Sequence, residues 1–108
     1  MSFKIISTPF FIRDAKPMAK KYPSFKNDLA QLQVQLSANP TLGEPLGKDC
    51  YKIRLLITSK GKGKSGGARV ITCVKIVEET IFLLAIYDKN EMDNISDAVL
   101  EERLKGFR

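Results

Sequence analysis

The chain has 108 residues, of which 44% are hydrophobic and 28% are charged, proportions typical of one folded domain rather than a disordered or fibrous chain. It contains no histidine, which excludes serine–histidine triads, cysteine–histidine dyads, histidine-based nucleases and histidine–cysteine zinc sites. The longest apolar run, residues 81–87, is far too short to cross a bilayer, and residues 1–13 lack the apolar core of a secretory signal. We therefore expect a single soluble, cytoplasmic domain over residues 1–108.

The net charge of +6 is concentrated in the middle of the chain. Residues 51–75 carry seven basic side chains and no acidic ones, whereas residues 76–108 have a net charge of −4. Such a segment is typical of a surface that binds a polyanion, most often a nucleic acid; the alternative is a lysine-rich loop that only aids solubility. The two cysteines, Cys50 and Cys73, match no metal-binding spacing and are interpreted as reduced residues of the core or its edge.

The first part of the chain predicts one strand and two helices. Residues 3–7 are typical of a short strand, and the Thr-Pro pair at 8–9 is typical of a helix start. Apolar residues at helical spacing then predict helices over residues 9–22 and 25–38. Pro17 is expected to kink or split the first of these helices.

The second part of the chain predicts three strands and a short helix. Residues 41–49 are expected to form a loop, followed by strands over 51–57, 68–77 and 80–87 and by a helix that Ser96 caps. The last strand is apolar throughout and is expected to be central. The order β-α-α-β-β-β-α predicts an α+β fold, in which two N-terminal helices pack on an antiparallel meander and a short helix ends the chain.

Basic residues on the first two strands of this meander form the candidate site. Lys52 and Arg54 share one face of their strand, and Arg69 begins the adjacent strand. Three cations on one face repel each other, and such an arrangement is typical of an anion-binding site. The connecting loop, residues 58–67, places Lys60, Lys62 and Lys64 among glycines, which suits contact with a phosphate backbone.

Three segments resemble the RelE/ParE superfamily of bacterial toxins, and most closely its RelE/HigB-like branch. They are residues 49–55 (DCYKIRL), 67–71 (GARVI) and 84–91 (LAIYDKNE), while the N-terminal helices match only in pattern. The resemblance implies a RelE-like fold and the toxin of a type II toxin–antitoxin system. The implied activity is a ribosome-dependent endonuclease that cuts mRNA in the ribosomal A site through attack of a ribose 2′-OH on the adjacent phosphate.

The resemblance also implies a role for individual residues. Lys52 corresponds to a base that also contacts phosphate, Arg54 to a residue that holds the phosphate, and Arg69 to an arginine that stabilises the pentavalent transition state. Lys89 or Asn90 falls where RelE has a further arginine, and Lys89 is expected to protonate the leaving oxygen or bind RNA. The expected catalytic set is Lys52, Arg54, Arg69 and Lys89, and the expected RNA-binding set is Lys60, Lys62, Lys64, Tyr87 and Asn90.

One departure from the family pattern leaves a second hypothesis open. RelE has a base-stacking tyrosine near its C-terminus, whereas the corresponding position here is close to Ser96, and Tyr87 precedes that region. The alternative is a non-nuclease binding module of the same fold, such as a ParE-like inhibitor of DNA gyrase, although the Lys52–Arg54 pair argues against it. Either function implies a cognate antitoxin that covers Arg54 or Arg69 or displaces the C-terminal helix. No metal, organic cofactor or membrane partner is implied.

Overall fold

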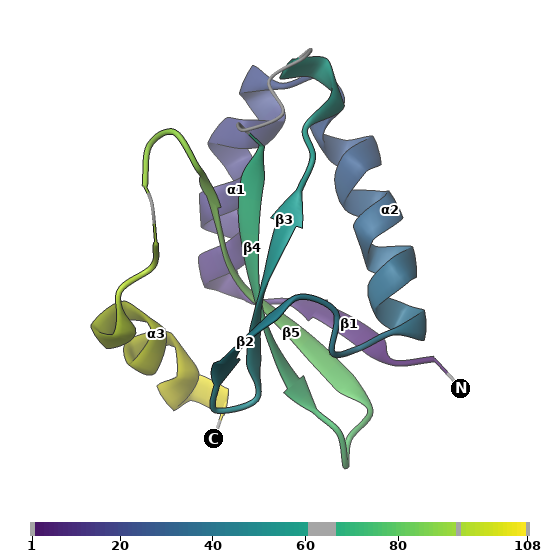
Figure 1. The fold of residues 1–108 in the computed structure, drawn as a ribbon, viewed down its shortest axis with the longest axis vertical. Helices are drawn as coiled ribbons and strands as arrows, with labels where there is room; N and C mark the ends of the chain where they lie inside the picture. Colours follow the sequence, from purple (N-terminus) through teal and green to yellow (C-terminus); the bar gives the residue numbers. More distant parts are fainter. Residues whose placement is uncertain (1, 61–66, 93, 108) are drawn as a thin grey trace.

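The computed structural model describes residues 2–60, 67–92 and 94–107. Within them, one sheet has the strand order β1-β5-β4-β3-β2, with α-helices packed on it (Figure 1). The strands are β1 Lys4–Ser7, β2 Glu44–Gly47, β3 Cys50–Leu55, β4 Ala68–Lys75 and β5 Thr80–Asp88. The helices are α1 Pro9–Lys21, α2 Phe25–Ala38 and α3 Asp97–Leu104, with 3-10 turns at Thr58–Lys60 and Lys105–Phe107. The expected α+β fold is confirmed, with β2 as an additional strand.

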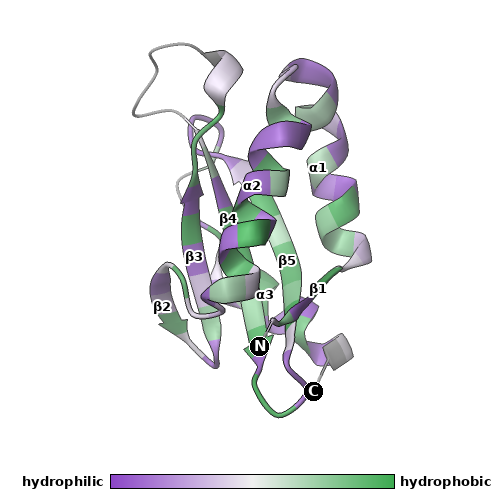
Figure 2. Cartoon of the chain, turned by 90° about the vertical axis from the view of Figure 1, so that its right-hand side faces the viewer, coloured by the Kyte–Doolittle hydropathy of each residue, from purple (hydrophilic) through white to green (hydrophobic). Residues whose placement is uncertain are grey.

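Helices α1 and α2 cover one face of the sheet, which we call the helix-covered face. The Thr8 hydroxyl accepts a hydrogen bond from the Phe11 backbone N–H and donates one to the Leu83 carbonyl, so the start of α1 is fixed to β5. The predicted apolar stripes point inward, because their buried members pack against strand residues in one core cluster. Figure 2 shows hydrophobic residues along β5 and on parts of α1 and α2, with polar residues on the remaining helix surface.

The expectation of a split at Pro17 is wrong, because α1 runs as one helix from Pro9 to Lys21, while the alternative of a kink at this residue stays a prediction. Pro17 lacks the N–H that would bond to the carbonyl of Arg13, four residues earlier. Both of these residues are exposed, so water can satisfy that carbonyl. Phe11 before the proline and Met18 after it both pack in the core, which stabilises both halves of the helix.

The expected loop at residues 41–49 contains a strand instead. β2 pairs antiparallel with β3, and the pair Gly47–Cys50 closes a two-residue turn in which Lys48 and Asp49 both have positive φ angles. Such turns usually contain asparagine and glycine, so the local sequence does not signal this hairpin. Pro45 is tolerated because β2 lies at the edge of the sheet.

β5 is an internal strand between β1 and β4, as expected, and β4 is the middle strand of the five. β1 pairs parallel with the outer side of β5, so the sheet is mixed, although β3, β4 and β5 form the expected antiparallel meander. The apolar character of β5 follows from its internal position and from burial on both faces. No helix in the described part of the chain is long and apolar enough to cross a membrane.

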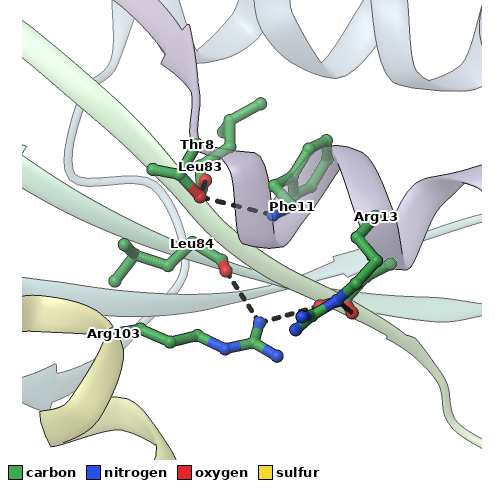
Figure 3. Close-up of polar contacts among 7 residues, drawn as sticks. Thr8, Phe11, Arg13, Leu83, Leu84 and Arg103 are labelled. Atoms are coloured by element: carbon green, nitrogen blue, oxygen red, sulfur yellow. Dashed lines mark hydrogen bonds and ion pairs between the residues drawn. The ribbon is translucent and has the colours of Figure 1, made fainter.

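The opposite face of the sheet, which we call the α3 face, carries a second core cluster under α3. Leu100 and Leu104 of α3 pack there against apolar residues of β3, β4 and β5. Arg103 anchors the helix, because its Nη1 donates to the Leu84 carbonyl at 2.9 Å and to Asp14 Oδ2 of α1 at 2.7 Å (Figure 3). Its guanidinium also lies 5.2 Å from the centre of the Phe10 ring.

Candidate functional site

Arg54, Arg69 and Tyr87 lie in register on three neighbouring strands, and we call this set the arginine row. Arg54 of β3 is directly opposite Arg69 of β4, and Arg69 is directly opposite Tyr87 of β5. Alternation along β3 places Arg54 on the same face as Lys52 and Cys50, and Cys50 and Tyr87 both belong to the cluster under α3. The arginine row therefore lies on the α3 face, as the sequence predicts for Lys52 and Arg54.

The two arginines are a closely spaced cross-strand pair. The Asp49 carbonyl accepts a hydrogen bond from the Val74 N–H at 2.9 Å, so the pair that follows, Cys50–Cys73, is a non-hydrogen-bonded pair. Every second pair along the ladder is of the same type, and Arg54–Arg69 is one of them. Side chains approach each other most closely at such positions.

Within the described residues, this pair of arginines has no carboxylate partner. Arg69 is only 8% exposed, and its hydrogen bond in the described structure is from Nη1 to the Ala68 carbonyl at 3.2 Å. No carboxylate among residues 2–60, 67–92 and 94–107 forms an ion pair with Arg54 or Arg69. Like charges directly opposite each other are destabilising, and burial of a charge adds to the cost. A bound anion would remove both penalties, so the arginine row has the properties of an anion-binding site.

Lys52 lies two residues before Arg54 on the same face of β3, and two side chains hold it in place. Its Nζ donates a hydrogen bond to Asn94 Oδ1 at 2.9 Å and lies 3.8 Å from Glu44 Oε1. Glu44 comes from β2, where it pairs directly with Lys52. Just before it, Gly43 has a φ of +108° and passes so close to the Lys52 carbonyl that a Cβ would lie 2.6 Å from that oxygen. The approach of β2 to Lys52 therefore requires glycine there.

Tyr87, Lys89 and Asn90 lie at the end of β5. Tyr87 is 8% exposed within the arginine row, Lys89 is half-buried and Asn90 is exposed. The Lys89 N–H donates to the Gly67 carbonyl at 3.2 Å, which brings Lys89 to the start of the strand that carries Arg69. Asp88 fixes this turn, since it accepts hydrogen bonds from the Asn90 N–H and the Tyr22 hydroxyl. The structure thus places Lys89 at the same end of the sheet as the two arginines.

The start of the lysine-rich loop is tied to α2 by the buried carboxylate of Asp28. Its oxygens accept hydrogen bonds from the Thr58 N–H and hydroxyl, at 2.9 and 2.7 Å, and from the Ser24 hydroxyl at 2.7 Å. Burial alone would raise the pKa of Asp28, but these hydrogen bonds outweigh it and hold the pKa below its ordinary value. Lys60 ends the 3-10 turn that Asp28 anchors. The predicted RNA-binding residues Lys62 and Lys64 lie outside the described residues.

A cavity of about 310 Å³ opens beside Tyr87, between β5, α1 and α3. Its lining includes Tyr87, Asn94, Ser96 and Arg103, so it extends from the arginine row to the position near Ser96 that departs from the family pattern. Within the described residues, no group of three or more histidine, cysteine, aspartate or glutamate side chains could hold a metal ion.

Sequence reasoning missed Glu44 and Asn94. Glu44 lies in a segment without a strand signal, and Asn94 is 42 residues from Lys52 in a connection without regular structure. No local pattern predicts either contact, because both depend on how β2 and the connection to α3 return to the sheet. Segment 51–75 contains seven basic residues and no acidic ones. This charge excess is the one sequence signal that Lys52 would find its polar partners in other segments of the chain.

The fold and the site define a class of small α+β proteins that present paired cations on one face of a sheet. The family model described as the RelE toxin of the RelE/RelB toxin–antitoxin system matches residues 18–105. Because this match covers most of the chain, the protein belongs to the RelE toxin family.

Two solved structures show the same fold. One is an arginine-substituted double mutant of the E. coli toxin RelE in the free state, with a TM-score of 0.64 and 19% identity over 100% of both chains. The other is the intact E. coli RelBE toxin–antitoxin complex, with a TM-score of 0.59 and 18% identity over 79% of this chain and 94% of that chain. At these identities the similarity concerns the fold.

Proposed function

We propose that this RelE-family toxin is a ribosome-dependent mRNA endonuclease that cleaves by attack of a ribose 2′-OH on the adjacent phosphate. The observation that carries the proposal is the buried Arg69 directly opposite Arg54, with no ion-pair partner for either among the described residues. A phosphodiester gains negative charge as it becomes pentavalent, and two fixed guanidinium groups stabilise that charge more than the ground state.

In this mechanism Arg54 and Arg69 bind the non-bridging oxygens of the scissile phosphate. Lys52, as the neutral amine, accepts the proton of the 2′-OH while the 2′-oxygen forms a bond to phosphorus. The bond from phosphorus to the 5′-oxygen breaks, and Lys89 donates a proton to that oxygen. The products are a 2′,3′-cyclic phosphate and a 5′-hydroxyl. The hydrogen bond to Asn94 and the proximity of Glu44 hold the amino group of Lys52 beside the arginine row, whereas its role as the base follows from the family resemblance.

The proposed RNA path continues from the arginine row into the neighbouring cavity. The cavity beside Tyr87 has the size and the mixed polar and apolar lining to receive a nucleobase. By sequence, we also propose Lys60, Lys62 and Lys64, whose side chains lie outside the described part of the structure, as contacts for backbone phosphates. Asn90, exposed at the end of β5, would lie beside the same backbone.

We also propose a cognate antitoxin as partner, as the RelBE complex has for the E. coli toxin. Acidic antitoxin residues would neutralise Arg54 or Arg69, whose charge has no compensating carboxylate among the described residues. A complex in which both arginines remain exposed to solvent would contradict direct blocking of the site. Such a result would favour the displacement of α3 instead.

The function is tested by primer extension on a ribosome-programmed mRNA, with the same RNA without ribosomes as a parallel sample. We expect cuts only in the presence of ribosomes, and a loss of about 100-fold or more in Arg69→Ala. Lys75→Ala is the matched control, since it removes a positive charge from the opposite end of the same strand. Absence of cuts by folded, antitoxin-free protein would refute the proposal, and DNA gyrase inhibition would be tested next.

A further inference from the structure

The two cysteines, which the sequence separates by more than twenty positions, are directly opposite each other in the sheet. Cys50 of β3 pairs with Cys73 of β4. The hydrogen bond between the Asp49 carbonyl and the Val74 N–H flanks this pair and makes it a non-hydrogen-bonded one. In such pairs the Cα atoms lie about 4.5 Å apart, within the range of roughly 4.4–6.8 Å that disulfides span.

Both side chains point to the same face and share one environment. Cys50 is 1% exposed and Cys73 is 6% exposed, and both belong to the cluster under α3. Leu100 and Leu104 of α3 are members of this cluster, and Leu46 of β2 packs against it. The thiols are therefore juxtaposed with each other and shielded by the C-terminal helix and the edge strand.

We propose that Cys50 and Cys73 are a thiol modification site, at which a low-molecular-weight disulfide such as oxidised glutathione converts the pair to a cross-strand disulfide. One cysteine thiolate attacks the small disulfide, releases one thiol and forms a mixed disulfide. The second cysteine thiolate then attacks the protein sulfur of that mixed disulfide and releases the second thiol. The two cysteines lose two protons and two electrons in total, and the small disulfide gains them and is reduced to two thiols.

The elements that shield the pair are those most able to open locally. β2 is a four-residue edge strand that ends in a turn with positive φ at Lys48 and Asp49, and α3 is an eight-residue helix near the end of the chain. An ion pair joins Lys48, in the turn after β2, to Glu101 of α3. Short edge and terminal elements open at a small fraction of the cost of global unfolding. Reagent access through this opening does not require the protein to unfold.

The disulfide would close a loop that contains Arg54, the lysine-rich segment and Arg69. Closing a loop of this length restricts the unfolded chain more than the folded one, in which the two residues are already paired. We therefore expect oxidation to raise the melting temperature by about 5–10 °C. Excess dithiothreitol should reverse both the bond and the shift, because exchange with a dithiol returns both thiols.

The proposal is tested on the full-length protein by incubation with oxidised glutathione, followed by intact mass and by iodoacetamide labelling of remaining thiols. We expect a loss of about 2 Da, the mass of two hydrogens, and protection of both cysteines from the label. Cys50→Ser and Cys73→Ser should instead accumulate a single glutathione adduct. Arg103→Ala, which loosens α3 while both thiols remain, should speed the reaction severalfold.

Two outcomes would overturn the inference. One is that the wild-type protein, incubated with oxidised glutathione, keeps both cysteines as thiols at every temperature up to the start of its melting transition. The other is a protein that ends with two glutathione adducts or with intermolecular dimers in place of the internal bond. Neither readout depends on RNA cleavage, so the failure of this inference is distinguishable from the failure of the proposed function.

Discussion

The two faces of the sheet are built on different principles. The helix-covered face is a continuous apolar layer, in which buried residues of β3, β4 and β5 meet α1 and α2. The α3 face is apolar only beneath α3, and it continues into Arg69, Arg54 and Lys52, with Arg69 buried and without a described carboxylate partner. The first face stabilises the fold, whereas the second carries adjacent like charges that are expected to lower stability and that we propose an anion neutralises.

The comparison shows where substitutions should have structural effects and where they should have functional ones. Truncating an apolar residue on the helix-covered face removes packing with no compensation. Replacing a crowded cation on the α3 face relieves repulsion and burial of charge. Shortening a buried apolar side chain on the helix-covered face is therefore expected to lower stability. Replacing a crowded cation on the α3 face with an uncharged residue is expected to maintain or raise it.

The largest effect on stability is expected for Leu83→Ala in β5. Leu83 is completely buried on the helix-covered face, and its truncation leaves a cavity that costs about 3–4 kcal/mol. Urea denaturation measures the loss of unfolding free energy. Val34→Ala on α2 is the control, because Val34 is 72% exposed and should change stability by less than about 0.5 kcal/mol. Equal effects for the two substitutions would refute the assignment of this face as the core.

A smaller loss is expected for Arg103→Ala, which breaks the attachment of α3. The substitution removes the partner of Asp14 and of the Leu84 carbonyl, and we expect a cost of about 2 kcal/mol. Hydrogen exchange should speed up most in α3 and less in β4. Lys105→Ala is the control, because the 75% exposed side chain of Lys105 forms a surface ion pair with Glu102. A uniform increase in exchange across the sheet would show that Arg103 supports the whole fold rather than this helix.

The smallest effect is a pH dependence that originates at Asp28. The folded-state pKa of Asp28 lies below its unfolded-state value of about 3.9, so its carboxylate stabilises the protein fully above that pH. This contribution is lost as the pH falls through the folded-state pKa. The difference in unfolding free energy between wild type and Asp28→Asn should therefore shrink below about pH 4. A difference that does not change with pH would contradict this origin.

Local signals were sufficient to predict most of the helix-covered face. The stripes that begin at Phe11 and Phe25, the cap at Thr8 and the meander all follow from residues close together in the sequence. The split at Pro17 was predicted wrongly, because tertiary packing of α1 on the sheet outweighs the loss of one hydrogen bond. Local patterns therefore predict a helix or strand best where a single apolar side of that element packs in the core.

The α3 face could be predicted only in part. Alternation along one strand places Lys52 and Arg54 together, and a hairpin between neighbouring strands brings Arg69 opposite Arg54. The contacts of Lys52 with Asn94 and Glu44, and the pairing of β1 with β5, depend on segments far apart in the sequence. Such contacts are set by the closure of the fold rather than by a local pattern.

The central claim is that Arg69 is kept for anion binding and not for stability, and Arg69→Met tests it most directly. Unfolding free energy and cleavage of ribosome-bound mRNA would be measured on the same preparation. Because methionine fills the site without charge, we predict unchanged or higher stability, by up to about 1 kcal/mol, together with loss of cleavage. A variant that is less stable than wild type, or that still cleaves at the wild-type rate, would contradict the account.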